Sequence, residues 1–175
     1  ENEGKNVAYE SWSFVFMLQG MFSCVNNLSA LYISLNPNKK PLGRLDALGV
    51  AVWTTGFLFE AIGDKQLTEF KKKAENKGKL MKEGVWQYTR HPNYFGEAAC
   101  WWGIYLMAAN LGLGGKLTFI SAATITYLVR YISGVDMLER KQKLKPEFHI
   151  YMAETSPFLP MPKKTLTEGQ KAEIL

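Results

Sequence analysis

Residues 11–38 have the sequence SWSFVFMLQGMFSCVNNLSALYISLNPN, which contains no Asp, Glu, Lys or Arg. Its apolar part, residues 14–35, exceeds the roughly 20 residues that an α-helix needs to cross a bilayer. The stretch therefore predicts a first transmembrane span, with the buried helix of a soluble protein as the alternative.

Three more apolar stretches follow, at residues 45–63, 94–115 and 117–135. Small residues within them, such as Ala98, Ala99 and Gly103, favour close contacts between helices. The 175 residues include only two Cys, which excludes a disulfide scaffold. We expect an all-α integral membrane helix bundle of about four spans, forming one domain over residues 1–163 and followed by a polar C-terminal tail at 164–175.

The basic residues are distributed unevenly between the two sides of such a bundle. Four spans place both termini and the loop between spans two and three on one side, which then holds most of the 21 Lys and Arg. The opposite side holds only Lys39, Lys40, Arg44 and Lys116. The positive-inside rule assigns the basic side to the cytoplasm or matrix, in the endoplasmic reticulum or the mitochondrial inner membrane. Aromatic residues are not interleaved with the lysines, so we expect membrane lipids and not nucleic acid as partners.

The densest polar motif is GVWQYTRHPNYFGE at residues 84–97, where the basic loop enters the third span. Pro92 suits the first turn of a helix, because its missing N–H would have no partner there. Free backbone N–H groups at this helix start, beside Arg90 and His91, predict a site for a phosphate or carboxylate.

Asn93, Glu97 and Trp101 recur every four residues and therefore line one face of this helix. A carboxylate within a span is costly unless it is paired. We therefore expect Glu97 to face a partner such as a ligand amide or Arg130.

Glu60 and Asp64 lie one helical turn apart, where the second span reaches the basic loop. They suit a general acid and base, ligands of a divalent metal, or acceptors for the hydroxyl and amide groups of a nucleotide; loop lysines could equally pair with them. His91 and His149 have no short ligand spacing, which argues against a metal. No nucleophile motif is present, and no catalytic residue is assigned.

Several blocks resemble the DUF1295 branch of the steroid 5-alpha-reductase C-terminal family over residues 14 to about 163: FEAIGDKQL (59–67), WQYTRHPNYFGE (86–97), WWG (101–103), SGV (133–135) and TSPFLP (155–160). The resemblance implies NADPH bound between the last helices and reduction of an activated carbon–carbon double bond in a steroid- or lipid-like substrate. It also implies that Asn93 and Glu97 hold the nicotinamide end, that Asp64 lies at the nucleotide and that Arg130 begins the last cofactor-binding stretch. The candidate cofactor-binding residues are Glu60, Asp64, Arg90, His91, Asn93, Tyr94, Glu97 and Arg130.

The Arg-His-Pro-x-Tyr core at residues 90–94 also resembles isoprenylcysteine-type methyltransferases, in which it holds S-adenosylmethionine. The WWG motif and the acidic pair Glu60 and Asp64 favour the reductase branch. Reductase relatives carry their substrate-polarising residues on additional N-terminal spans, which we expect this chain to lack. A third hypothesis is therefore a non-catalytic accessory subunit of a larger membrane complex, without a cofactor.

Overall fold

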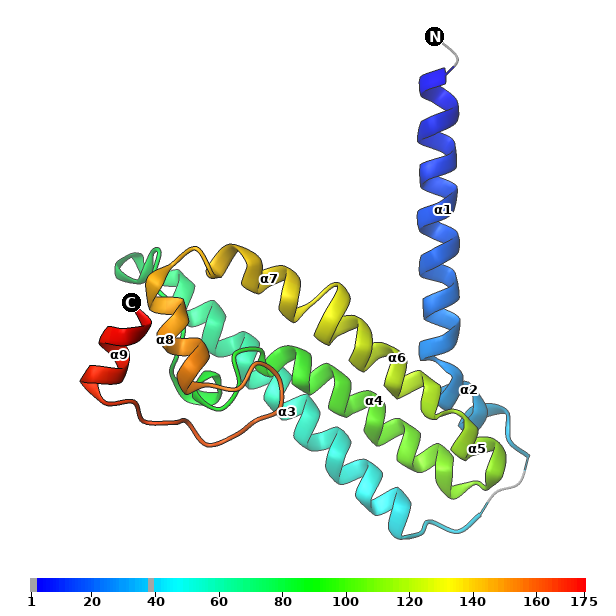
Figure 1. Cartoon of the computed structure of the whole chain (residues 1–175). Helices are drawn as coiled ribbons and strands as arrows, with labels where there is room; N and C mark the ends of the chain where they lie inside the picture. Colours follow the sequence, from blue (N-terminus) through cyan, green and yellow to red (C-terminus); the bar gives the residue numbers. More distant parts are fainter. Residues whose placement is uncertain (1–2, 38–39) are drawn as a thin grey trace.

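The computed structural model describes residues 3–37 and 40–175, which form helices and no extended strand (Figure 1). The α-helices are α1 (Glu3–Asn26), α2 (Leu28–Leu35), α3 (Arg44–Lys72), α4 (Pro92–Asn110), α5 (Leu113–Leu117), α6 (Phe119–Tyr127), α7 (Val135–Gln142), α8 (Pro146–Glu154) and α9 (Glu168–Ile174). Short 3₁₀ turns at Ala74–Asn76 and Gly84–Gln87 and a π-helical turn at Leu128–Ile132 complete the order. The all-helical prediction is confirmed.

Helices α3 and α4 form an antiparallel pair whose backbones touch. Glycines spaced seven residues apart on α3 meet small residues of α4: a Cβ on Gly49 would lie 2.7 Å from the Gly103 carbonyl oxygen, and one on Gly56 2.6 Å from that of Gly96. Real side chains do not tolerate such distances, so only glycine permits this contact. The expectation that Gly103 allows close packing is confirmed.

Hydrogen bonds fix one end of this pair, and the packing of a proline fixes the other. At the start of α3, Asp46 accepts hydrogen bonds from the backbone N–H of Gly43 (2.7 Å) and from the side chain of Asn110 (2.6 Å), the last residue of α4. An acidic side chain here satisfies an otherwise unpaired N–H and complements the helix dipole. At the other end, Pro92 begins α4, as predicted, and packs against Gly63.

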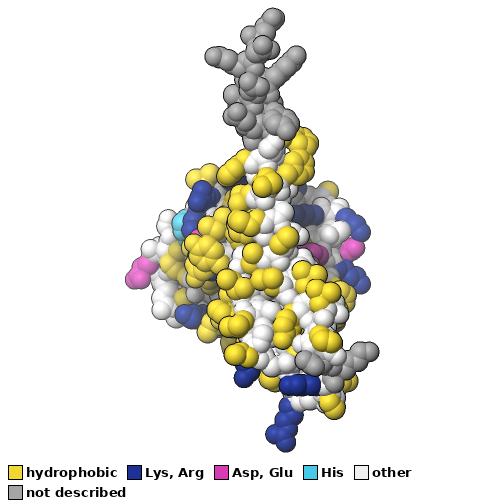
Figure 2. Space-filling model, turned by 90° about the vertical axis from the view of Figure 1, so that its right-hand side faces the viewer, with side chains coloured by type: hydrophobic (Ala, Val, Ile, Leu, Met, Phe, Trp, Pro, Cys, Tyr) yellow, Lys and Arg dark blue, Asp and Glu magenta, His cyan; other side chains and the backbone are white. Residues whose placement is uncertain are grey.

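Helix α6 lies along α4, and α7 continues beyond it toward α8 and α9 (Figure 1). A compact core joins these elements to the segment after α8, and its buried members are Ala98, Ile125, Val129, Val135 and Phe158. Helix α1 instead projects away from the bundle, with Phe14 69% and Met17 76% exposed. Figure 2 shows apolar side chains over the middle of one face and Lys and Arg toward its margins.

One helix of the described chain, α3, is long and apolar enough to cross a membrane, and α1 and α2 meet the same criteria only when taken together. Four straight spans are therefore not confirmed. The first predicted span bends by 53° between residues 26 and 28. The third, α4, starts with a polar turn, and the fourth is divided among α5, α6 and the π-helical turn. Lys39, assigned to the side opposite the basic loop, lies outside the described residues.

Buried hydroxyl groups join the bend in the first predicted span to the start of α6. Ser29 and Ser121 are fully buried. The Ser29 hydroxyl is hydrogen-bonded to that of Thr118 at 2.9 Å, and the Ser121 hydroxyl donates to the carbonyl of Asn26. The Ser121 bond thus supplies a partner to a backbone carbonyl at the point where the helix is interrupted.

Replacing Gly56 tests the α3–α4 contact. In Gly56→Ala the new methyl group would collide with the backbone of Gly96, so we expect a loss of about 1–3 kcal/mol in unfolding free energy. Gly20→Ala is the matched control, because no described atom outside its own stretch of helix lies within 4 Å of its Cβ position and alanine favours the helix. Thermal unfolding in detergent measures both, and equal stability of the two variants would contradict the contact.

Candidate functional site

A buried charge cluster lies where the basic loop enters α4. The Arg90 Nε is 2.8 Å from Glu139 Oε1, its Nη2 is 3.2 Å from Glu139 Oε2, and His91 Nε2 is 3.1 Å from Glu139 Oε1. Arg90 is 6% and Glu139 3% exposed. Two parallel bonds between a guanidinium and a carboxylate make a strong and strongly oriented pair.

Two further donors of Arg90 also bind protein atoms. Its Nη1 donates to the carbonyl oxygens of Thr155 and Met152, the latter at 3.2 Å. Arg90 thus ties the start of α4 to α7 and to the end of α8. The sequence predicted a phosphate or carboxylate site at free backbone N–H groups beside Arg90 and His91. Arg90 itself has little left for such a ligand, because Glu139 and the two carbonyls occupy four of its five N–H donors.

The same cluster sets the protonation of its carboxylate. Burial opposes ionisation of Glu139, but the hydrogen bonds from His91 and Arg90, with their charges, outweigh burial and lower the pKa of Glu139 from 4.5 to about 2. Burial also raises the pKa of the neighbouring Tyr151, whose hydroxyl donates to the carbonyl of Trp86. Glu139 is therefore charged and Tyr151 neutral at pH 7.

A cavity of about 610 Å³ opens beside this cluster, between the end of α3, the basic loop, α7 and α8. Arg90, His91 and Asn93 line it, with Phe148 and Tyr151 of α8. Its cations are Lys71, Lys73, Lys77, Lys79 and Lys145. The volume lies within the range of sites for small molecules and cofactors.

Two amide oxygens in the cavity wall lack donors. Asn93 Oδ1 and Gln142 Oε1 are shielded from water and accept no hydrogen bond from any residue that the structure describes. An unpaired buried acceptor costs about 1–3 kcal/mol, which a ligand N–H group would recover once the amide turns toward the cavity.

The other predicted site residues lie elsewhere among the described residues. Glu60, Asp64, Tyr94 and Glu97 form a second group on α3 and α4, in which the Glu60 carboxyl interacts electrostatically with those of Asp64 and Glu97. They do not line the lysine-rich cavity. The expected pairing of Glu97 with Arg130 is wrong, because Arg130 Nη1 binds Asp136 Oδ1 at 2.8 Å.

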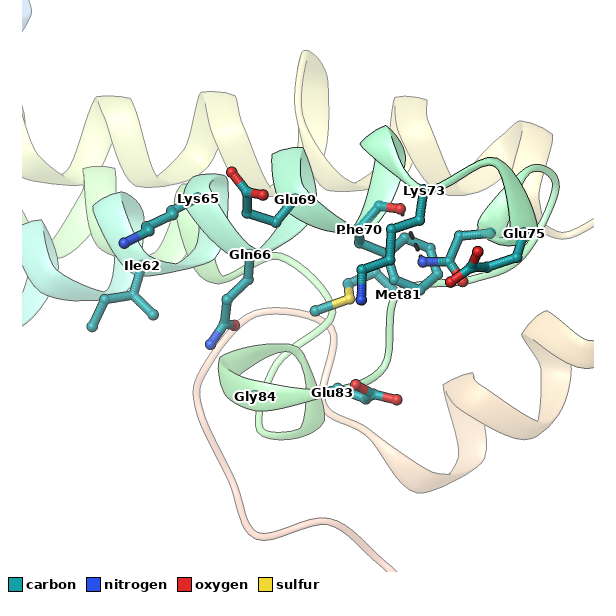
Figure 3. Close-up of a pocket in the computed structure, with 11 residues that line it drawn as sticks. Ile62, Lys65, Gln66, Glu69, Phe70, Lys73, Glu75, Met81, Glu83 and Gly84 are labelled. Carbon is teal, nitrogen blue, oxygen red and sulfur yellow. Dashed lines mark hydrogen bonds between the residues drawn. The ribbon is translucent and has the colours of Figure 1, made fainter.

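A second hollow of about 610 Å³ lies on the other side of Phe70 and Met81, which line both spaces. In Figure 3 Gln66 points toward Gly84, and its oxygen accepts a hydrogen bond from the Val85 N–H at 3.0 Å. Gly84 has φ +61°, a conformation that favours glycine, and so lets the loop turn beneath α3. The indole of Trp86 donates to the Gly63 carbonyl at 3.0 Å and completes this attachment.

Comparison with known proteins gives one family and no individual relative. A family model described as "Protein of unknown function (DUF1295)" matches residues 1–155. The comparison with curated proteins found no match, and neither did the comparison with solved structures.

Sequence reasoning missed Glu139, which is 49 positions from Arg90 and belongs to none of the motifs that indicated a site.

Acidification tests the charge cluster. Because the pKa of Glu139 is lowered on folding, its contribution to stability is complete above pH 4.5 and is lost as the pH falls toward 2. Glu139→Gln should lose about 3–5 kcal/mol at neutral pH, since it leaves Arg90 buried without its counter-ion. It should also show a weaker dependence of stability on pH between 4.5 and 2.

The control is Glu168→Gln, which removes a carboxylate that is 89% exposed and pairs with Lys171 on α9. Unfolding monitored by circular dichroism across this pH range compares the variants. The charge cluster would be refuted as a stabilising element if Glu139→Gln behaved like Glu168→Gln.

Proposed function

The chain belongs to the DUF1295 family, and from this membership and the cavity we propose that it is a membrane-embedded NADPH-dependent reductase acting on a steroid- or lipid-like enone. The lysine-rich cavity is the observation that supports the proposal. NADPH would supply the hydride, and the chain's own residues would bind and orient it.

Charge favours NADPH over S-adenosylmethionine as the ligand. The pyrophosphate and the 2′-phosphate make NADPH a polyanion, whereas S-adenosylmethionine carries a sulfonium and an ammonium group against one carboxylate. Five lysines around one opening produce a positive potential that attracts the first ligand and repels the second. Because Arg90 is bound to Glu139, the lysines are the cations that remain for phosphate binding.

The amide of Asn93 supports a position for the nicotinamide end. Its unpaired oxygen suits the N–H donors of a carboxamide, and it lies in the first turn of α4. Glu97 follows one turn later on α4, at the start of the apolar part of the bundle. An apolar substrate entering from the membrane would meet the reactive end of the coenzyme on this side.

The proposal also includes an orientation in the membrane. The cavity lies at the end of α3 that carries Lys71 and Lys72, and the positive-inside rule assigns this end to the cytoplasm or matrix. NADPH would then enter from the aqueous side while the substrate arrives laterally. Other membrane subunits would pack against the exposed apolar faces of α1 and α3.

Coenzyme binding tests the proposed function. At about 100 times its Kd, NADPH should stabilise the purified chain by roughly 2.7 kcal/mol, seen as a rise in Tm. Reversing two cavity charges in Lys77→Glu with Lys79→Glu should weaken binding by roughly tenfold or more. Lys40→Glu with Lys116→Glu is the control, because both lysines are exposed and belong to the segments that precede α3 and follow α4, away from the cavity.

An unchanged Tm at saturating NADPH would contradict the proposal. A rise in Tm with S-adenosylhomocysteine alone would select methyl transfer instead. Equal effects of the two double variants would show that the cavity lysines are not the binding site.

A further inference from the structure

Gln142, the last residue of α7, is the second amide with an unpaired oxygen in the lysine-rich cavity. The terminal amide torsion of Gln is broad, so a rotation of the amide brings its oxygen to face a ligand in the cavity. No motif of the sequence indicated this residue. Its unsatisfied oxygen nevertheless needs a ligand that carries an N–H donor, as the oxygen of Asn93 does.

The residues around Gln142 suit a planar base attached to a phosphate. Leu138 precedes it by one turn of α7, is 47% exposed and lines the cavity. Phe148 contributes a further apolar wall from α8. Lys145, between the two helices, donates to the Gly78 carbonyl at 2.9 Å, and its ammonium group retains two further protons for an anion.

An amide is the side chain that matches an aminopurine. It can accept a hydrogen bond from the exocyclic amino group of adenine while donating to a ring nitrogen, which is how Gln and Asn recognise adenine in nucleic acids. A carboxylate or carbonyl ligand would leave Gln142 Oε1 without a donor. The surroundings of Gln142 therefore favour adenine over an acidic or purely apolar group.

We infer that Gln142, with Leu138, Lys145 and Phe148, forms the subsite for the adenine end of the coenzyme. This inference rests on the proposed function and deepens it, because it assigns the two unpaired amides to the two ends of one ligand. Asn93 receives the carboxamide at the membrane side, and Gln142 receives the 6-amino group of adenine on the aqueous side. The lysines bind the phosphates between them.

The test compares NADPH with its purine analogue, in which hydrogen replaces the 6-amino group and no base N–H remains for the Gln142 oxygen. Fluorescence titration of the full chain in nanodiscs measures both Kd values. We expect the native chain to bind NADPH roughly fivefold to tenfold more tightly than the analogue, the worth of one hydrogen bond. Gln142→Leu should reduce this ratio to about one while retaining a folded chain, since leucine has a similar volume and no unpaired oxygen.

Gln19→Leu is the matched control, because Gln19 is exposed on α1 and does not line the cavity. It should keep the preference of the native chain for NADPH. An unchanged preference in Gln142→Leu, or no preference in the native chain, would overturn the inference while leaving the proposed function intact. Failure of the native chain to bind either dinucleotide would remove the proposed function and the inference together.

Discussion

The direct backbone contact between α3 and α4 is the constraint on which the rest of the structure depends. Gly49, Gly56 and Gly63 lie along one strip of α3. They let α4 approach so closely that a side chain at any of these positions would collide with α4. Because lipid supplies no hydrophobic drive between helices, such close packing is a main source of association within a membrane. The contact also determines where Pro92 lies, and with it the start of α4 and the loop attached to α3 through Trp86.

The cavity follows from that placement together with one buried ion pair. Arg90 and Glu139 neutralise each other and tie α7 and α8 to the start of α4, so the pair builds the wall of the cavity without adding net charge to it. The lysines, which carry compact charges on flexible side chains, provide the positive potential instead. Arg90 therefore holds the helices together while the lysines attract the anion, because four of the five N–H donors of Arg90 already bind protein atoms.

Local features of the sequence predicted the helical class, the start of α4 at Pro92 and the presence of Arg90, His91 and Asn93 in one site, because motifs and periodicity report on neighbours along the chain. Contacts between distant residues were not predictable in this way. The bend after Asn26 depends on Ser121, and the role of Arg90 depends on Glu139. The seven-residue spacing of the α3 glycines was a readable signal, but only the structure identifies their partners.

The most direct test of this account is hydrogen–deuterium exchange of the reconstituted chain with and without NADPH. The account predicts slower exchange in two separated segments, residues 71–93 and 138–151, because both line the cavity. The amides within the α3–α4 contact should already exchange slowly without the ligand. Protection confined to α1 and α6, or no change in either cavity segment at saturating NADPH, would contradict the assignment of the cavity as a coenzyme site.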